Sequence, residues 1–171
     1  MTIMKALVLC GSGTPGGNTE RMCQVFAEEL GLNGDSYEVV RLSDHSILDY
    51  TGNHPYDDEM EDFCYRMEDT DLLVFSSPIY FNGCSSIMKR FIDRLNPYWG
   101  SDRRHPRYCC GLLDGGSPEP EFSHARSEMV SASNTVGMEW LGELCIGGTD
   151  RNGIDEGRVR AFAKDILSRI S

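Results

Sequence analysis

Gly11-Ser-Gly-Thr-Pro-Gly-Gly-Asn-Thr19 joins an apolar run at residues 3–10 to an amphipathic helical pattern that begins near Asn18. Four of these nine residues are glycine, which leaves backbone amides free to converge on an anion. The following helix adds its unpaired amides and the positive end of its dipole. We therefore expect an anion site here. Its predicted donors are backbone amides, that of Gly17 among them, and the side chains of Ser12, Thr14, Asn18 and Thr19.

Basic residues are missing from this loop. No Lys or Arg lies between Lys5 and Arg21, whereas a Walker A loop ends in Gly-Lys-Ser/Thr so that the lysine reaches the outer phosphates. The sequence therefore predicts a single phosphate monoester that is held by neutral donors. The alternative is a glycine-rich connector that binds no ligand.

Composition narrows the class of protein. The 171 residues are typical of one folded unit, and we expect residues 1–171 to form a single domain. The net charge of −11 at pH 7 disfavours a nucleic acid or an anionic membrane as a partner. Neither an 18-residue apolar stretch nor a signal-peptide pattern is present, so we expect a cytoplasmic protein without membrane insertion.

The seven cysteines form no C-x-x-C pair. Their spacing disfavours a disulfide framework, structural zinc and a cysteine-ligated cluster, and we expect no metal. His45 and His54 stand near Asp49 and Asp57, and we interpret this stretch as a polar loop.

Apolar runs alternate with helical patterns along the chain. Strands are predicted at residues 4–10, 37–42, 72–77, 108–113 and 139–146, and helices at residues 19–30, 57–67, 86–95, 121–136 and 156–170. Short strands that alternate with helices form right-handed β-α-β units. The predicted fold class is therefore α/β, with a parallel sheet covered by helices on both faces.

Ligands of such a sheet bind beyond the carboxyl ends of its strands. The loop after the third strand, residues 76–86, offers aromatic faces and amides that suit a flat heteroaromatic ring. The loop after the fourth strand, residues 114–120, contains a Gly-Gly pair that fits the other rim of a ring, although such a pair is also a common connector. The alternative for the aromatic residues is packing beneath their loop. The predicted ring contacts are Pro78, Ile79, Tyr80, Phe81, Asn82, Gly83, Gly115 and Gly116.

The order of these segments resembles the flavodoxin-like NAD(P)H-dependent FMN reductases, including the branch related to iron–sulfur flavoproteins. The resemblance covers nearly the whole chain and is most specific at residues 11–19, 71–81 and 88–94. It implies a three-layer sandwich whose five parallel strands follow the order 2-1-3-4-5. It places the FMN phosphate in the first loop and the isoalloxazine against residues 78–83, with Gly115 and Gly116 as further contacts. Residues 46–56 contain no cysteine, so the cluster of the iron–sulfur branch is not expected.

The resemblance also implies a chemistry. NADPH or NADH would reduce FMN, and a small acceptor such as a quinone or free flavin would take the electrons, so that FMN carries the chemistry and no catalytic side chain is required. A homodimer or a tetramer is implied as well. Two alternatives stay open: a flavodoxin-like FMN electron carrier without efficient NAD(P)H turnover, and a flavin-free binding domain. The neutral loop that leads to Lys89 and Arg90 favours the enzyme over the carrier.

Overall fold

Five parallel strands form the sheet, in the order β2 (Ser36–Arg41), β1 (Lys5–Cys10), β3 (Leu72–Tyr80), β5 (Tyr108–Asp114) and β6 (Glu139–Ile146). The two-residue β4 (Gly83–Cys84) pairs antiparallel with the end of β3 and lies off this path. The structure is a computed structural model and describes residues 2–170. With β4 left out of the count, the strand order is the predicted 2-1-3-4-5.

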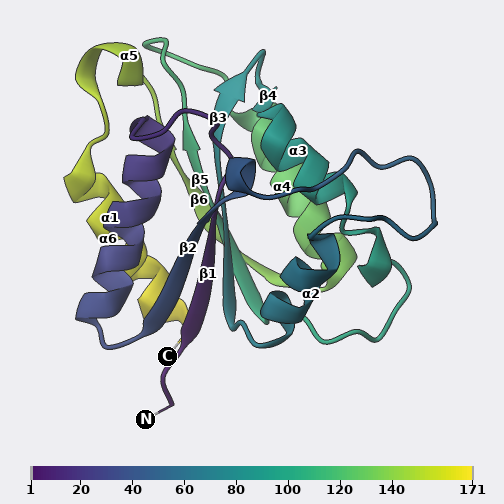
Figure 1. The fold of residues 1–171 in the computed structure, drawn as a ribbon. Coiled ribbons are helices and arrows are strands. Elements are labelled where there is room, and N and C mark those ends of the chain that lie inside the picture. Colours follow the sequence, from purple (N-terminus) through teal and green to yellow (C-terminus); the bar gives the residue numbers. More distant parts are fainter. Residues whose placement is uncertain (1, 171) are drawn as a thin grey trace.

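Helices cover both faces of the sheet. In Figure 1, α1 (Asn18–Leu32) and α6 (Glu156–Ile170) lie on one face, and α2 (Met60–Glu68), α3 (Ser86–Asp93) and α4 (Ser123–Val136) lie on the other. Alternating side chains of each strand supply the two cores: Leu7 and Leu9 of β1 belong to the α2–α4 side, and Val8 and Cys10 belong to the α1–α6 side. The predicted three-layer flavodoxin-like sandwich is therefore confirmed.

Most boundaries lie within two residues of the prediction, and three differences are larger or of another kind. β3 continues through Pro78 to Tyr80 instead of ending at Ser77, because it gains β4 as a partner. α2 begins at Met60 rather than near Asp57, since the Asp58 carboxylate accepts the Met60 amide at 3.0 Å. A short helix that was not predicted, α5 (Thr149–Asn152), follows β6. Two 3₁₀ turns, at Leu42–Asp44 and Asn96–Tyr98, complete the elements.

The long connection before α2, residues 45–59, is tied to the end of α3 by a buried ion pair. Arg94 Nη1 lies 2.5 Å from Asp58 Oδ2, and the same nitrogen donates to the Leu48 carbonyl at 2.9 Å. The Arg94 guanidinium also lies over the Tyr56 ring, 3.5 Å from its centroid. Within residues 2–170, none of the helices has both the length and the apolarity that crossing a bilayer requires.

Candidate functional site at the carboxyl edge of the sheet

Three loops that the sequence marked as functional meet at the carboxyl edge of the sheet. We call residues 11–19 the first loop, residues 76–86 the second and residues 114–120 the third. The Gly11 amide donates to the Ser76 carbonyl at 2.7 Å, and Ser85 Oγ donates to the Gly11 carbonyl at 2.5 Å. Thr19 Oγ1 in turn donates to Asp114 Oδ1 at 2.6 Å. Side by side at the top of Figure 1, the three loops therefore form one hydrogen-bonded unit.

The close approach of these segments leaves no room for a side chain at Gly11. A Cβ at this position would lie 2.9 Å from both the Ser76 carbonyl oxygen and the Met88 Cβ, which is closer than packed atoms tolerate. The same Ser85 hydroxyl that holds Gly11 accepts the Met88 amide at 3.1 Å and so caps α3. One side chain thus fixes the first loop to the start of α3.

The outer part of the first loop is exposed, and its Gly16 and Gly17 amides donate to the Glu20 carboxylate and the Thr14 carbonyl. Ser12 Oγ accepts the Thr14 amide at 3.1 Å, so this hydroxyl shapes the turn from within. The helix that follows begins after Gly17, and this N-cap residue provides no side-chain cap for the first-turn amides. Residues 13–16 are exposed to solvent. An anion that reaches this surface meets an uncapped helix N-terminus.

Three of the predicted phosphate donors have protein partners in the structure. The Thr19 hydroxyl donates to Asp114, the Asn18 side-chain amide donates to the Thr149 carbonyl at 3.2 Å, and the Gly17 amide donates to the Thr14 carbonyl at 3.3 Å. These side chains join the first loop to the third loop and to α5. At Asn18 and Thr19, only the backbone amides of the first turn of α1 are left for an anion. Ser12, Thr14 and Gly17 lie on the loop itself.

The second loop forms a tight hairpin rather than an open loop. Tyr80 pairs with Gly83, and the two residues between them have positive φ values, 49° at Phe81 and 69° at Asn82. This is the pattern of a type I′ turn, which favours Asn-Gly, so a phenylalanine here carries a conformational cost of about 1–2 kcal/mol. Tyr80 is exposed and Phe81 is fully exposed. The packing alternative is therefore wrong for both aromatic side chains.

The other predicted residues of the hairpin lie closer to the sheet. Pro78 is buried and stands opposite Asp114 in the β3–β5 register, and Ile79 is half-buried. Ser77 Oγ accepts the Ser85 amide at 2.9 Å, which closes the base of the hairpin. The hairpin thus presents a rigid stem with Tyr80, Phe81 and Asn82 at its tip.

Glycines in the third loop allow a close approach of the start of α5. A Cβ on Gly115 would lie 2.7 Å from Pro120 Cγ and 3.1 Å from Ile79 Cγ1, and one on Gly116 would lie 2.4 Å from the Asp150 carboxyl group. The carbonyls of Gly115 and Gly116 accept the amides of Thr149 and Asp150. The pair is thus held between the hairpin and α5.

Two charged residues at this edge were not predicted from the sequence. Asp114 ends β5, and burial raises the pKa of its carboxyl group to about 6, although the Thr19 hydrogen bond acts in the opposite direction. Arg41 ends β2, next to Cys10 of β1 in the sheet register. Both lie at the predicted carboxyl ends of strands, which is the signal in the sequence. That they lie beside the first loop becomes visible only with the strand order and register.

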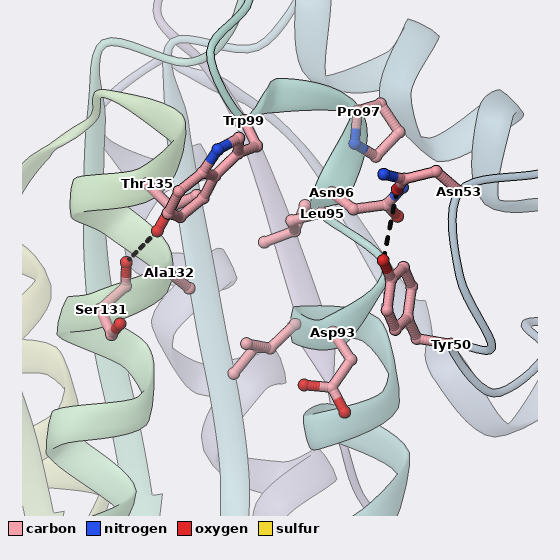
Figure 2. A pocket seen from close by; sticks show the side chains of 11 residues that line it. Tyr50, Asn53, Asp93, Leu95, Asn96, Pro97, Trp99, Ser131, Ala132 and Thr135 are labelled. Carbon is pink, nitrogen blue, oxygen red and sulfur yellow. Dashed lines mark hydrogen bonds between the residues drawn. The ribbon is translucent and has the colours of Figure 1, made fainter.

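A cavity of about 620 Å³ lies elsewhere, between the 45–59 connection, the end of α3 and α4. Figure 2 shows Tyr50, Trp99 and Thr135 around it, with the Tyr50 hydroxyl bonded to Asn53. None of the predicted cofactor residues lines this cavity. We place the candidate site at the sheet edge because the uncapped helix N-terminus and the exposed aromatic hairpin are there.

Other reactive side chains do not add to the site. Burial raises the pKa of the Cys84 thiol to about 12, so it stays protonated at neutral pH. His45 pairs with Glu59 at 3.1 Å, and His54 stacks on Tyr56. Among residues 2–170, no group of three or more His, Cys, Asp or Glu side chains has the arrangement of a metal site.

Sequence comparison adds the family. Residues 4–117 match the protein family that is described as NADPH-dependent FMN reductase. Iron–sulfur flavoproteins of Archaeoglobus fulgidus and Methanocaldococcus jannaschii are 31% and 26% identical over 103 and 102 residues, which cover 56% and 55% of this chain. These matches span about half of the curated relatives, 47% and 53% of their length.

Solved structures share the fold. The NAD(P)H:quinone oxidoreductase from Methanothermobacter marburgensis is 17% identical, with a TM-score of 0.76 over 97% of this chain and 98% of that one. The family match runs from before β1 to residue 117, so it covers the first and second loops and the start of the third loop at the sheet edge. The chain belongs to the NADPH-dependent FMN reductase family.

Proposed function

We propose that this chain is an oxidoreductase that uses NADPH or NADH to reduce a small acceptor, such as a quinone or free flavin, with FMN as its cofactor. FMN is the cofactor of the family to which the chain belongs. The observation that carries the proposal is the pairing of an uncapped helix N-terminus with an exposed aromatic hairpin at one edge of the sheet. A phosphate and a flat ring would each find their own partner there.

The residues fit both ends of FMN. The first loop, with Ser12, Thr14 and Gly17 and the first-turn amides at Asn18 and Thr19, would hold the phosphate. For the ring we propose the hairpin residues and the glycine pair, namely Pro78, Ile79, Tyr80, Phe81, Asn82, Gly83, Gly115 and Gly116. Tyr80 and Phe81 are exposed and offer their faces to a ring.

FMN, when bound, supplies the hydride and electron transfer. The side chains of the protein need only bind and orient FMN and its substrates and exclude competing reactions. The Ser77–Ser85 and Ser85–Gly11 hydrogen bonds fix the hairpin and the first loop relative to each other, which sets the distance between the ring and phosphate sites. Cys84, whose pKa is raised by burial, holds its proton and takes no part in the transfer.

Absorbance spectroscopy tests the proposal. After incubation with FMN and removal of the free cofactor, the purified protein is expected to show the visible bands of a bound flavin. Anaerobic NADPH or NADH is expected to bleach these bands without added dithionite, and a quinone is expected to restore them. Absence of bound flavin would contradict FMN binding. If the bands bleach only with dithionite, the result would contradict the enzyme and favour the FMN electron carrier.

We also propose that the protein acts in the cytoplasm as a homodimer or a tetramer. Phe81, 107% exposed at the strained hairpin tip, supports this assembly because a second copy would cover it. Sedimentation equilibrium is expected to give at least twice the 19.1 kDa chain mass. In Phe81→Asn, a residue that tolerates positive φ replaces the ring, and the assembly is expected to weaken. A monomer at micromolar concentration would refute the proposal.

A further inference from the structure

Arg41 brings a positive charge to the first loop from a different strand. It is the last residue of β2 and pairs in register with Cys10, the residue directly before the first loop. Side chains alternate along a strand, so Arg41 shares a face with Val39, which packs against the core on the α1–α6 side. The guanidinium therefore lies beside the first turn of α1, where Glu20 meets it.

The polar side-chain contacts that Arg41 makes within residues 2–170 are long. Its Nε lies 3.5 Å from Glu20 Oε2, its Nη1 lies 3.5 Å from Asp44 Oδ1, and its Nη2 donates to Ser43 Oγ at 3.4 Å. Good guanidinium–carboxylate hydrogen bonds measure about 2.7–2.9 Å. The Nε atom is buried, and no group in the described part of the chain forms a hydrogen bond with it. Arg41 is thus a partly buried cation whose hydrogen-bonding capacity is largely unused.

Glu20 links this cation to the first loop. The oxygen that faces Arg41, Oε2, also accepts the Gly16 amide at 2.8 Å. An oxygen that carries negative charge therefore sits where a loop amide and a guanidinium converge, at the N-terminus of a 15-residue helix. This is the arrangement in which proteins hold a phosphate oxygen.

We propose that Arg41 is the cation of the phosphate site and selects FMN over riboflavin. In the free protein, the Glu20 carboxylate occupies the position of the phosphate until a phosphate displaces it. The inference rests on the proposed function. A phosphate monoester carries about 1.5–2 negative charges at pH 7. A chain with a net charge of −11 binds such a group at a lower electrostatic cost when a guanidinium stands beside it. The first loop is then free of Lys and Arg, but its site is not.

The test compares FMN with riboflavin, which has the same ring without the phosphate. Flavin fluorescence titrations of the flavin-free protein give both affinities. Arg41→Gln is expected to lower FMN affinity about tenfold or more and riboflavin affinity less than about twofold. Arg41→Lys, which keeps the charge, is expected to recover part of the loss. Equal losses for both flavins would overturn the inference, because they would mark a structural role.

A second arginine provides the control. Arg66 lies on α2, pairs with Glu38 at 2.9 Å, and lines a cavity with Lys5 and Ser36, which begin β1 and β2 at the opposite edge of the sheet. Arg66→Gln makes the same change in net charge and is expected to leave FMN affinity within about twofold of the original protein. A loss as large as that of Arg41→Gln would overturn the assignment in favour of a general charge effect.

Glu20→Gln tests the other half of the inference. Glutamine can still accept the Gly16 amide, but it carries no charge that competes with phosphate. FMN affinity is expected to rise several-fold with no change for riboflavin, and an unchanged or lower FMN affinity would refute the role of Glu20. The proposed function fails separately, since it requires only that the original protein bind FMN.

Discussion

Replacing Asp58 with alanine is expected to lower the free energy of unfolding by about 3–5 kcal/mol. The side chains of Arg94 and Asp58 are only 5% and 2% exposed, and they meet at 2.5 Å. Burial acts to raise the pKa of Asp58, but hydrogen bonds from Arg94 and from the amides of Leu48 and Met60 hold the pKa below its usual value. The alanine variant leaves the Arg94 cation buried without its partner, which is the costly change.

Urea unfolding measures this effect, and a surface pair is the matched control. Asp49 contacts Arg90 at 2.6 Å but is 77% exposed. Asp49→Ala is therefore expected to cost less than about 1 kcal/mol. Replacing both Asp58 and Arg94 with leucine is expected to recover part of the stability that Asp58→Ala loses, because no buried charge remains unpaired. A loss for Asp58→Ala no larger than that for Asp49→Ala would contradict the prediction.

Asp114→Asn is expected to stabilise the protein by about 2–3 kcal/mol above pH 7 and by little near pH 4. The folded pKa of Asp114 is about 6, against an ordinary value of 3.8. A group whose pKa rises on folding contributes stability that is complete below its unfolded pKa and is lost as the pH rises through its folded pKa. The penalty of the buried carboxylate therefore develops between about pH 4 and pH 6. Asparagine avoids this penalty and can still accept the Thr19 hydroxyl.

Unfolding free energies of both proteins at several pH values between 4 and 8 test this window. Asp150→Asn is the control, because Asp150 is exposed and only adds a repulsive charge near Asp114. It is expected to shift stability by less than about 0.5 kcal/mol at any pH. If the advantage of Asp114→Asn were constant across the range, titration of Asp114 would not be its cause.

Local patterns predicted the fold well and the hairpin poorly. Five apolar runs and the helices between them determine a parallel sheet, because the connections are right-handed. The end of β3 escaped prediction because Pro78 lacks an amide and usually ends a strand. Phe81-Asn82 also lacks the Asn-Gly signal of a tight hairpin turn. The hairpin forms because Ser77 accepts the Ser85 amide and because the Ala125 amide at the start of α4 donates to the Asn82 carbonyl.

In the candidate site too, local sequence patterns predicted some features and missed those that depend on long-range contacts. Its loops were predictable because the carboxyl ends of neighbouring parallel strands share one edge. Arg41 and Asp114 were not, since their nearness to the first loop depends on strand register and on which face each side chain occupies. The partners of Asn18 and Thr19 likewise come from segments about 130 and 95 residues away. No local pattern contains such contacts.

The Ser85 hydroxyl has a consequence for how a ligand would enter. It accepts from α3 and donates to the first loop, so two walls of the site are joined before anything arrives. A preorganised site loses little chain entropy when it is filled, and more of the contact energy remains for affinity. Encounter would then be limited by diffusion and charge rather than by a slow rearrangement of the loops.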